Sequence, residues 1–130
     1  MRWSKYNKYG AVKVKALDGT VYDSKKERSR AIQLEMLQRA GKIKDLKRQV
    51  PFELIPAQYE TVERYGKNGK RLKDGKKLIE RKCEYVADFT YIDVKTGEYV
   101  VEDAKGVRTK EYVIKRKLML HVHGIKLREV

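Results

Sequence analysis

The sequence predicts a single domain with an α/β fold. Two segments with helix-capping residues, 24–40 and 109–122, bracket runs of β-branched and aromatic residues that are typical of strands. From the first helix onward, the expected order is helix, three strands with an inserted hairpin, helix and strand. We assign residues 1–130 to this domain, with an N-terminal arm and small hairpin in residues 1–22 and the inserted hairpin in residues 57–83.

Residues 84–105 are expected to form the central hairpin. Aromatic and β-branched side chains fill both halves of this stretch, and a short segment between them ends in a glycine that suits a tight turn. If the chain folds back about that turn, Asp93 lies opposite Glu98. Further along the same two strands, this register places Asp88 opposite Asp103.

Side-chain alternation predicts which acids share a face of this hairpin. Lys105 is expected beside Asp103, while Glu102 and Ala104 point to the other face. Asp88 would share the face of Asp103, and two like charges set directly opposite each other destabilise a sheet. The pair therefore favours a site with a cation between the carboxylates. Glu102 would replace Asp103 there if a β-bulge shifted the register by one residue.

The first helix carries a further acid. Ser24 is a good N-cap, and Gly41 is a good residue to follow the last turn. Glu27, Ala31 and Leu34 share one face by their spacing, so Glu27 is expected to point where the apolar residues point. Ser24 and Glu27 also match a capping box, which would explain the glutamate without a functional role. The sequence leaves both interpretations open.

The second helix is expected to begin after Thr109, a candidate N-cap, and to end at Gly124. Residues 125–130 alternate in polarity as a last strand. His121 and His123 are two positions apart, so on a helix they face apart and do not form a metal pair. We interpret them as helix-end residues or incidental phosphate contacts.

The composition limits the partners and the compartment. The chain has 32 Lys and Arg against 18 Asp and Glu, a formal net charge of +14, which predicts a polyanionic partner and most simply nucleic acid. Cys83 is the only cysteine, which excludes an internal disulfide and fits a reducing cytosol. No apolar run is long enough to cross a bilayer, so we expect a cytoplasmic protein without membrane contact.

The basic residues gather in stretches that suit a phosphate backbone. The tip of the inserted hairpin, GKNGKRLKDGKK, is expected to be a mobile loop because of its glycines. The N-terminal arm interleaves cations with aromatic residues, which suits nucleic acid or merely anchors the arm. The candidate nucleic-acid contacts are Lys67, Lys70, Arg71, Lys73, Lys76 and Lys77 in the loop, Lys5 and Lys8 in the arm, and Lys110 in the second helix.

The position of one acid–lysine pair in the expected hairpin distinguishes it from the others. An acid two positions before a lysine recurs along this chain, but Asp103 and Lys105 end an apolar strand and face Asp88 across a hairpin. Carboxylate oxygens suit Mg²⁺, for which Mn²⁺ is a substitute, and such an ion activates water against a phosphodiester. A nearby lysine can orient that water or offset developing negative charge. Glu27 would supply a third acid if its helix packs beside the hairpin.

The order of these elements, with Glu27, then Asp88, then Asp103-Ala104-Lys105, resembles the PD-(D/E)XK nuclease superfamily. More closely, SKKE-x6-LE-x-L, the AGKI segment and YVADFTY…VVEDAKG resemble a family of small, mostly phage-encoded proteins placed in that superfamily. The likeness covers about residues 21–130. It implies a restriction-endonuclease-like αβββαβ core with a mixed sheet flanked by helices. By the same resemblance, Asp88 and Asp103 are metal ligands, Lys105 is the catalytic lysine and Glu27 is the helix acid.

The resemblance implies a metal-dependent endonuclease acting on duplex or branched DNA. Ala87 stands where the superfamily motif has proline, and Asp103 fills a position that admits either acid. By analogy, so short a phage protein suits a Holliday-junction resolvase in recombination or replication, and a homodimer would supply two sites for symmetric cutting. The alternatives are a non-catalytic nucleic-acid-binding protein and an assembly factor that binds an acidic protein.

Overall fold

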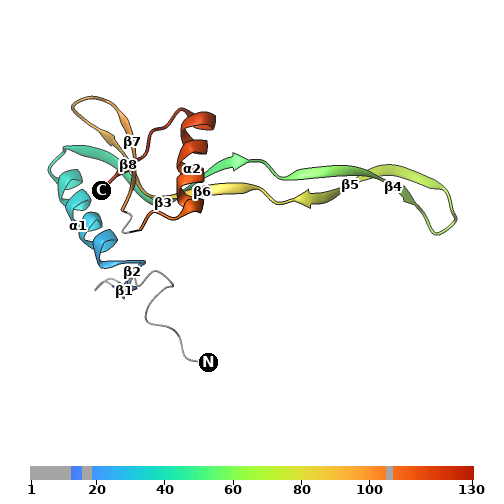
Figure 1. Cartoon of the computed structure of the whole chain (residues 1–130), viewed down its shortest axis with the longest axis horizontal. Helices are drawn as coiled ribbons and strands as arrows, with labels where there is room; N and C mark the ends of the chain where they lie inside the picture. Colours follow the sequence, from blue (N-terminus) through green and yellow to red (C-terminus); the bar gives the residue numbers. More distant parts are fainter. Residues whose placement is uncertain (1–12, 16–18, 105–106) are drawn as a thin grey trace.

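The structure, a computed structural model, describes residues 13–15, 19–104 and 107–130. It contains a body, made of a four-stranded sheet with two helices and a small β1–β2 sheet, and a long two-stranded arm projects from the four-stranded sheet (Figure 1). The elements are β1 (Val14–Lys15), β2 (Val21–Tyr22), α1 (Lys25–Arg39), β3 (Ile43–Ile55), β4 (Gln58–Tyr65), β5 (Arg71–Glu80), β6 (Cys83–Asp93), β7 (Tyr99–Asp103), α2 (Lys110–Leu118), the π-helical turn η1 (Met119–His123) and β8 (Arg128–Glu129).

The body contains a mixed sheet in the order β3-β6-β7-β8. β3 and β7 run antiparallel to β6, whereas β8 runs parallel to β7. β8 is shorter than the strand expected over residues 125–130. Pro51 lies in β3, at the edge of the sheet, where a residue without an N–H is tolerated. The predicted α/β fold with a mixed sheet is confirmed.

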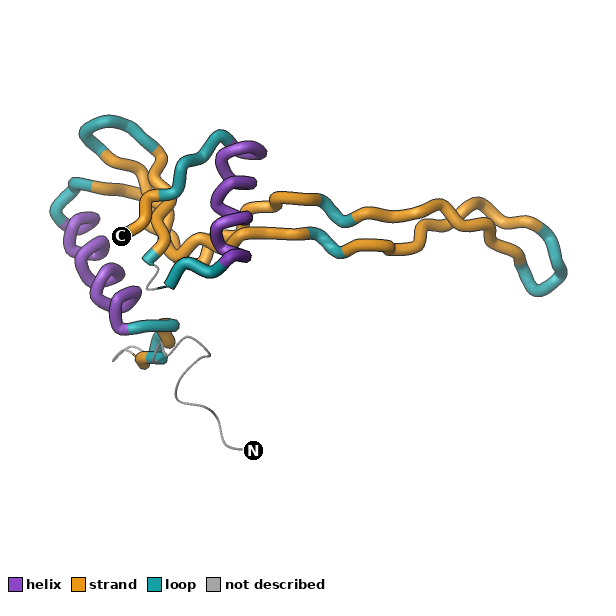
Figure 2. Tube along the Cα trace, viewed as in Figure 1, coloured by secondary structure: helices purple, strands orange, loops and turns teal. Residues whose placement is uncertain are grey.

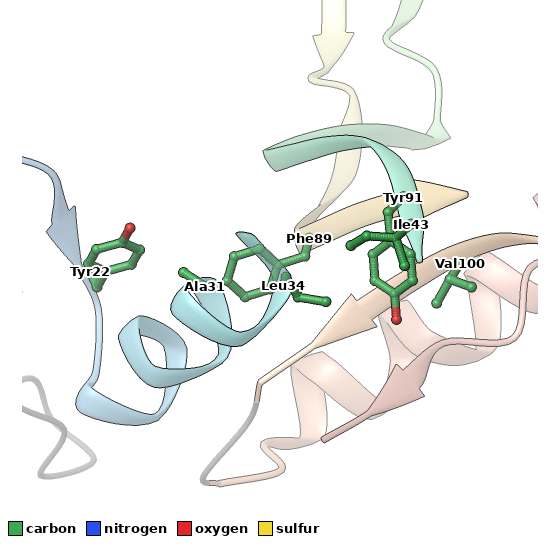
Figure 3. Packing of buried hydrophobic residues seen from close by; sticks show 7 residues of the cluster. All are labelled: Tyr22, Ala31, Leu34, Ile43, Phe89, Tyr91 and Val100. Atoms are coloured by element: carbon green, nitrogen blue, oxygen red, sulfur yellow. The ribbon is translucent and has the colours of Figure 1, made fainter. Parts of the chain in front are cut away.

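The two helices cover opposite faces of this sheet. Val100 belongs to the apolar cluster under α1, and the next residue, Val101, belongs to the cluster under α2. The α1 cluster (Figure 3) comprises Tyr22, Ala31, Leu34, Ile43, Phe89, Tyr91 and Val100. The α2 cluster comprises Leu54, Tyr85, Ala87, Val101, Tyr112, Met119 and Leu127. Burial of these side chains supplies the main favourable term for folding the body.

The helix ends follow their capping residues. The Ser24 hydroxyl accepts the Glu27 N–H at 3.1 Å, and the Thr109 hydroxyl accepts the Tyr112 N–H at 3.0 Å. The second helix ends at Gly124, whose φ of +67° is the left-handed conformation that glycine adopts readily. Both predicted N-caps are therefore confirmed.

The turn η1 packs the end of the second helix against β3. The His123 ring nitrogen Nε2 lies 2.6 Å from the carbonyl oxygen of Glu53, and its ring meets the Phe52 ring edge-on at 5.7 Å between centroids. The interpretation of His123 as a helix-end residue is therefore confirmed.

The arm is formed by β4 and β5, which continue β3 and β6 away from the body (Figure 2). The chain turns back at residues 66–70, where the Gly66 N–H is bonded to the Lys70 carbonyl oxygen at 2.8 Å. Residues 71–77 are part of β5 and pair with β4, for example Lys77 with Glu60. The prediction of a mobile loop over this stretch is therefore wrong.

Gly75 shows why a glycine in this stretch does not indicate a loop. It lies in the strand, and a Cβ atom at this position would come within 2.6 Å of the Arg64 Cδ atom. The glycine therefore allows the Arg64 side chain to cross the neighbouring strand, which is a different role from loosening a loop.

Candidate catalytic carboxylate site

The central hairpin has the predicted register, which sets Asp88 level with Asp103. Main-chain pairing of β6 with β7 ends at Phe89 and Glu102. Beyond this pair, the Asp88 carboxylate accepts the Ala104 N–H at 2.8 Å. A side chain thus replaces the main-chain acceptor at the end of β7, which fixes the position of Asp88.

The alternation of side chains breaks at Asp88. Ala87 belongs to the α2 cluster and Phe89 to the α1 cluster, although residues two apart on a regular strand share a face. Asp88 is half-buried at this change of face. Its charge raises the pKa of Glu27 on the α1 side and of Tyr85 on the α2 side. Asp88 is thus electrostatically coupled to groups on both faces, and its sharing one face with Asp103 stays a prediction.

Asp103 is fully buried on the α2 side. The Tyr85 hydroxyl donates a hydrogen bond to its Oδ2 atom. Burial, this bond and the charges of Asp103 and Asp88 raise the pKa of Tyr85, which keeps the phenol protonated as a donor. Tyr85 therefore orients Asp103 and lies within the field of Asp88 as well.

Glu102 is held on the opposite face in a structural ion pair. Arg30 of α1 donates to both carboxylate oxygens, from Nε at 2.8 Å and from NH2 at 2.5 Å. The Tyr91 hydroxyl donates to the same carboxylate, whose side chain is fully buried. No bulge shifts the register in the β6–β7 pairing. The bulge on which the Glu102 alternative depends is thus absent from the paired residues, and Arg30 and Tyr91 occupy this carboxylate.

Glu27 points into the body from the first turn of α1, as its spacing predicts, and is 2% exposed. Its Oε2 atom accepts the Asp23 N–H at 3.2 Å, one residue before the cap. Its Oε1 atom accepts hydrogen bonds from Arg48 at 3.2 Å and from the Gln49 amide at 3.1 Å. One oxygen therefore serves the helix end, and the other faces side chains of β3.

Burial is the largest cause that raises the pKa of Glu27, followed by repulsion from Asp88, and the bond from Arg48 opposes both. A buried acid beside a second acid is the arrangement in which perturbed carboxylates mark functional sites. Glu27 of α1 and Asp88 of β6, two of the predicted site residues, therefore interact electrostatically.

Glu27→Gln is expected to change the pH dependence of stability. The pKa of Glu27 in the folded chain lies above its ordinary value of 4.5. The wild type therefore loses stability as pH rises from about 4.5 through the pKa of the folded state. The variant lacks this loss. In thermal melting between about pH 4 and pH 8, the melting temperature of the variant should rise relative to that of the wild type as pH rises. Glu35→Gln on the exposed side of α1 is the control, and a pH-independent difference for Glu27→Gln would contradict the assignment.

Glu27 and Asp88 have the donor chemistry that suits Mg²⁺, which is bound in proteins by one or two carboxylates together with water and phosphate oxygens. Their mutual repulsion is the interaction that a bound cation would relieve. Over residues 13–15, 19–104 and 107–130, no group of three or more His, Cys, Asp or Glu could hold a metal ion. A metal site at these carboxylates, with or without Asp103, therefore stays a prediction.

The predicted nucleic-acid contacts that the structure describes lie in the arm and at the start of α2. Lys67 and Lys70 lie in the turn at the end of the arm, and Lys110 is exposed at the start of α2 (Figure 1). Arg71 is engaged within the arm, because its NH2 atom lies 3.0 Å from Asp74 and 3.7 Å from Glu63. The other predicted contacts on β5, all exposed, are Lys73, Lys76 and Lys77. Two of the predicted nucleic-acid contacts, Lys5 and Lys8, lie outside the described ranges, and so does the predicted catalytic lysine, Lys105.

Sequence reasoning missed Arg48, Gln49 and Tyr85 as neighbours of the site. Arg48 lies over the Tyr22 ring, 4.2 Å from its centroid, while it bonds to Glu27. None of the three has a distinctive spacing from the acids, and each contact depends on how the strands and α1 pack. No local sequence signal could have identified them.

Comparison with known proteins gives a family and no activity. Within the described part of the chain, no helix is both long and apolar enough to span a membrane. Searches of curated proteins and of solved structures found no match. A family model described as "Protein of unknown function (DUF1064)" matches residues 6–129, nearly the whole chain. The chain therefore belongs to the DUF1064 family.

Proposed function

We propose that this chain is a metal-dependent DNA endonuclease that hydrolyses phosphodiester bonds. The observation that carries the proposal is the buried carboxylate of Glu27, whose pKa is raised by burial and by the charge of Asp88. Asp88 itself is bonded to the Ala104 N–H, just after β7. A buried acid next to another acid lowers stability at neutral pH, so its presence favours a functional role over a structural one. The restriction-endonuclease-like core is the finer form of the α/β fold that this proposal assumes.

The residues of the chain contribute position and charge. The Ala104 amide holds Asp88 at the end of β7, and donors from β3 hold Glu27. Tyr85 orients Asp103, the proposed further ligand. When bound, Mg²⁺ would polarise the phosphate and lower the pKa of a water molecule. Lys105, which lies outside the described residues, is proposed to orient that water by analogy with the superfamily.

The arm is proposed to hold DNA beside the site. A two-stranded ribbon fits the major groove of B-form DNA, and the cations at the tip suit its phosphates. The formal net charge of +14 adds a sequence-independent attraction to the duplex. A projecting arm also suits branched substrates, so a preference for Holliday junctions is the finer form of the proposal.

Replacing Lys67 and Lys70 together by Ala is expected to weaken DNA binding and its dependence on salt. Each lost phosphate contact lowers the slope of log K against log salt by about 0.9, so the double variant should lose about 2. Fluorescence anisotropy at several salt concentrations measures this slope. Arg71→Ala is the matched control, because its guanidinium is already paired with two carboxylates and should matter less. An unchanged slope in the double variant would remove the tip from the interface.

A non-catalytic nucleic-acid-binding protein is the second candidate. The complete burial of Asp103 against Tyr85, and the lack of a three-residue metal group in the described ranges, favour structural roles for the acids. In this function the basic surface and the arm would act alone.

Cleavage of a labelled four-way junction beside its linear duplex separates the two candidates. We expect cutting with Mg²⁺ or Mn²⁺, no cutting with EDTA, and loss of cutting in Asp103→Ala. Faster cutting of the junction would support the resolvase form. A wild-type protein that binds both DNAs and cuts neither would overturn the nuclease proposal in favour of the binding protein.

A further inference from the structure

Gln49 has an unusual backbone for a residue in a strand. Its φ is +52°, and among the described non-glycine residues only Asp45 shares a positive φ, at +55°, also in β3. Side chains with a Cβ atom enter this region at an energetic cost, and such residues persist where the surroundings or the function require them. Gln49 is also exposed, so burial of its own side chain does not account for the conformation.

The backbone of Gln49 redirects its side chain. Consecutive side chains on a regular strand point to opposite faces. Arg48 and Gln49 nevertheless donate to the same atom, Glu27 Oε1, at 3.2 and 3.1 Å. The positive φ therefore turns the Gln49 amide toward the α1 side of the sheet, where Glu27 lies.

The irregularity of β3 coincides with that of β6. Arg48 pairs with Phe89, so the next residue, Gln49, stands level with Asp88, where β6 changes face. Both strands thus depart from regular geometry at one level, and Glu27 interacts with residues of both. Helix capping requires none of this, because the other oxygen of Glu27 accepts the main-chain N–H near the cap.

We infer that Gln49 is a positioning residue whose strained backbone aims its amide at Glu27 and holds that carboxylate beside Asp88 in the geometry that a divalent cation and a DNA phosphate require. The inference rests on the proposed nuclease function. Gln49 acts through Glu27, so it should govern the reaction rate and cation affinity and leave DNA affinity unchanged.

Two variants remove the amide contact and keep the backbone. Asn and Gly both tolerate a positive φ, and neither places an amide within reach of Glu27, so Gln49→Asn and Gln49→Gly should fold. Asp45→Gly is the matched control, because it relaxes the other positive-φ residue of β3. Four quantities are measured for each protein: the melting temperature, the Kd for a four-way junction, Mn²⁺ binding without DNA by electron paramagnetic resonance, and the single-turnover cleavage rate.

We expect both Gln49 variants to melt at or above the wild-type temperature and to bind the junction with unchanged Kd. Their Mn²⁺ affinity and cleavage rate should fall by about 10- to 100-fold, the usual effect of losing a residue that orients a ligand. Asp45→Gly should match the wild type in Mn²⁺ binding and cleavage.

Three results would overturn the inference. If both Gln49 variants bound Mn²⁺ and cleaved DNA as the wild type does, the inference would be overturned and the nuclease proposal would stand. A junction Kd that weakens as much as the rate would make Gln49 a DNA contact instead. A wild-type protein that neither binds Mn²⁺ nor cuts DNA would remove the nuclease proposal and this inference together.

Discussion

Asp88→Asn is expected to reduce metal-dependent cleavage by about 1,000-fold while DNA binding stays intact or becomes tighter. The amide oxygen of Asn can still accept the Ala104 N–H, so the end of β7 should keep its structure. The variant removes a negative charge that the proposed cation would need and that would repel the phosphates of bound DNA. Single-turnover cleavage and anisotropy with the same labelled DNA measure the two effects.

Asp74→Asn is the matched control for this prediction. It makes the same change in net charge on the arm, where Asp74 pairs with Arg71 at 3.0 Å. We expect this variant to cleave at the wild-type rate. If Asp88→Asn also cleaved at the wild-type rate with the same metal ion, Asp88 would have a structural role only.

Arg30→Met is expected to destabilise the fold by about 3–5 kcal/mol, the largest stability effect that we predict. Glu102 is fully buried, and removal of its partner leaves a carboxylate in the core whose remaining donor is the Tyr91 hydroxyl. Urea unfolding of the wild type and the variant measures the difference in free energy. The double variant Arg30→Met/Glu102→Met should recover most of the loss, because it removes both charges.

An exposed ion pair provides the comparison for Arg30. Lys115 lies 3.1 Å from Glu111 on α2, where the glutamate side chain is 77% exposed. Lys115→Met should therefore cost no more than about 0.5 kcal/mol. Equal losses for Arg30→Met and Lys115→Met would mean that burial of Glu102 does not matter.

The parts of the fold that depend on neighbouring residues could be predicted from sequence. The turn at Gly97 and the strand-forming residues on both sides determine the register of the central hairpin, and the structure has that register. Ser24 and Thr109 identify the helix starts for the same reason, because a capping hydroxyl acts within three residues. Spacing along α1 likewise predicted that Glu27 points inward.

The parts that depend on contacts between distant residues could not be predicted. The Gln49 side chain bonds to Glu27, more than twenty positions away in the sequence. The residue type of Gln49 gives no sign of its positive φ. Glycines and lysines in β5 are typical of a loop, yet pairing with β4 holds them extended. Regular alternation predicts that Ala87 and Phe89 share a face, and it fails where β6 passes from the α2 cluster to the α1 cluster.

The arm begins and ends at adjacent points of the sheet, since Ile55 of β3 pairs with Cys83 of β6. Its two strands can therefore be shortened or lengthened together without breaking the connection to the body. Each residue pair removed would draw the tip about 3.4 Å closer to Glu27 and Asp88. The number of paired residues in the arm therefore determines how far from the carboxylates the cations at its tip lie.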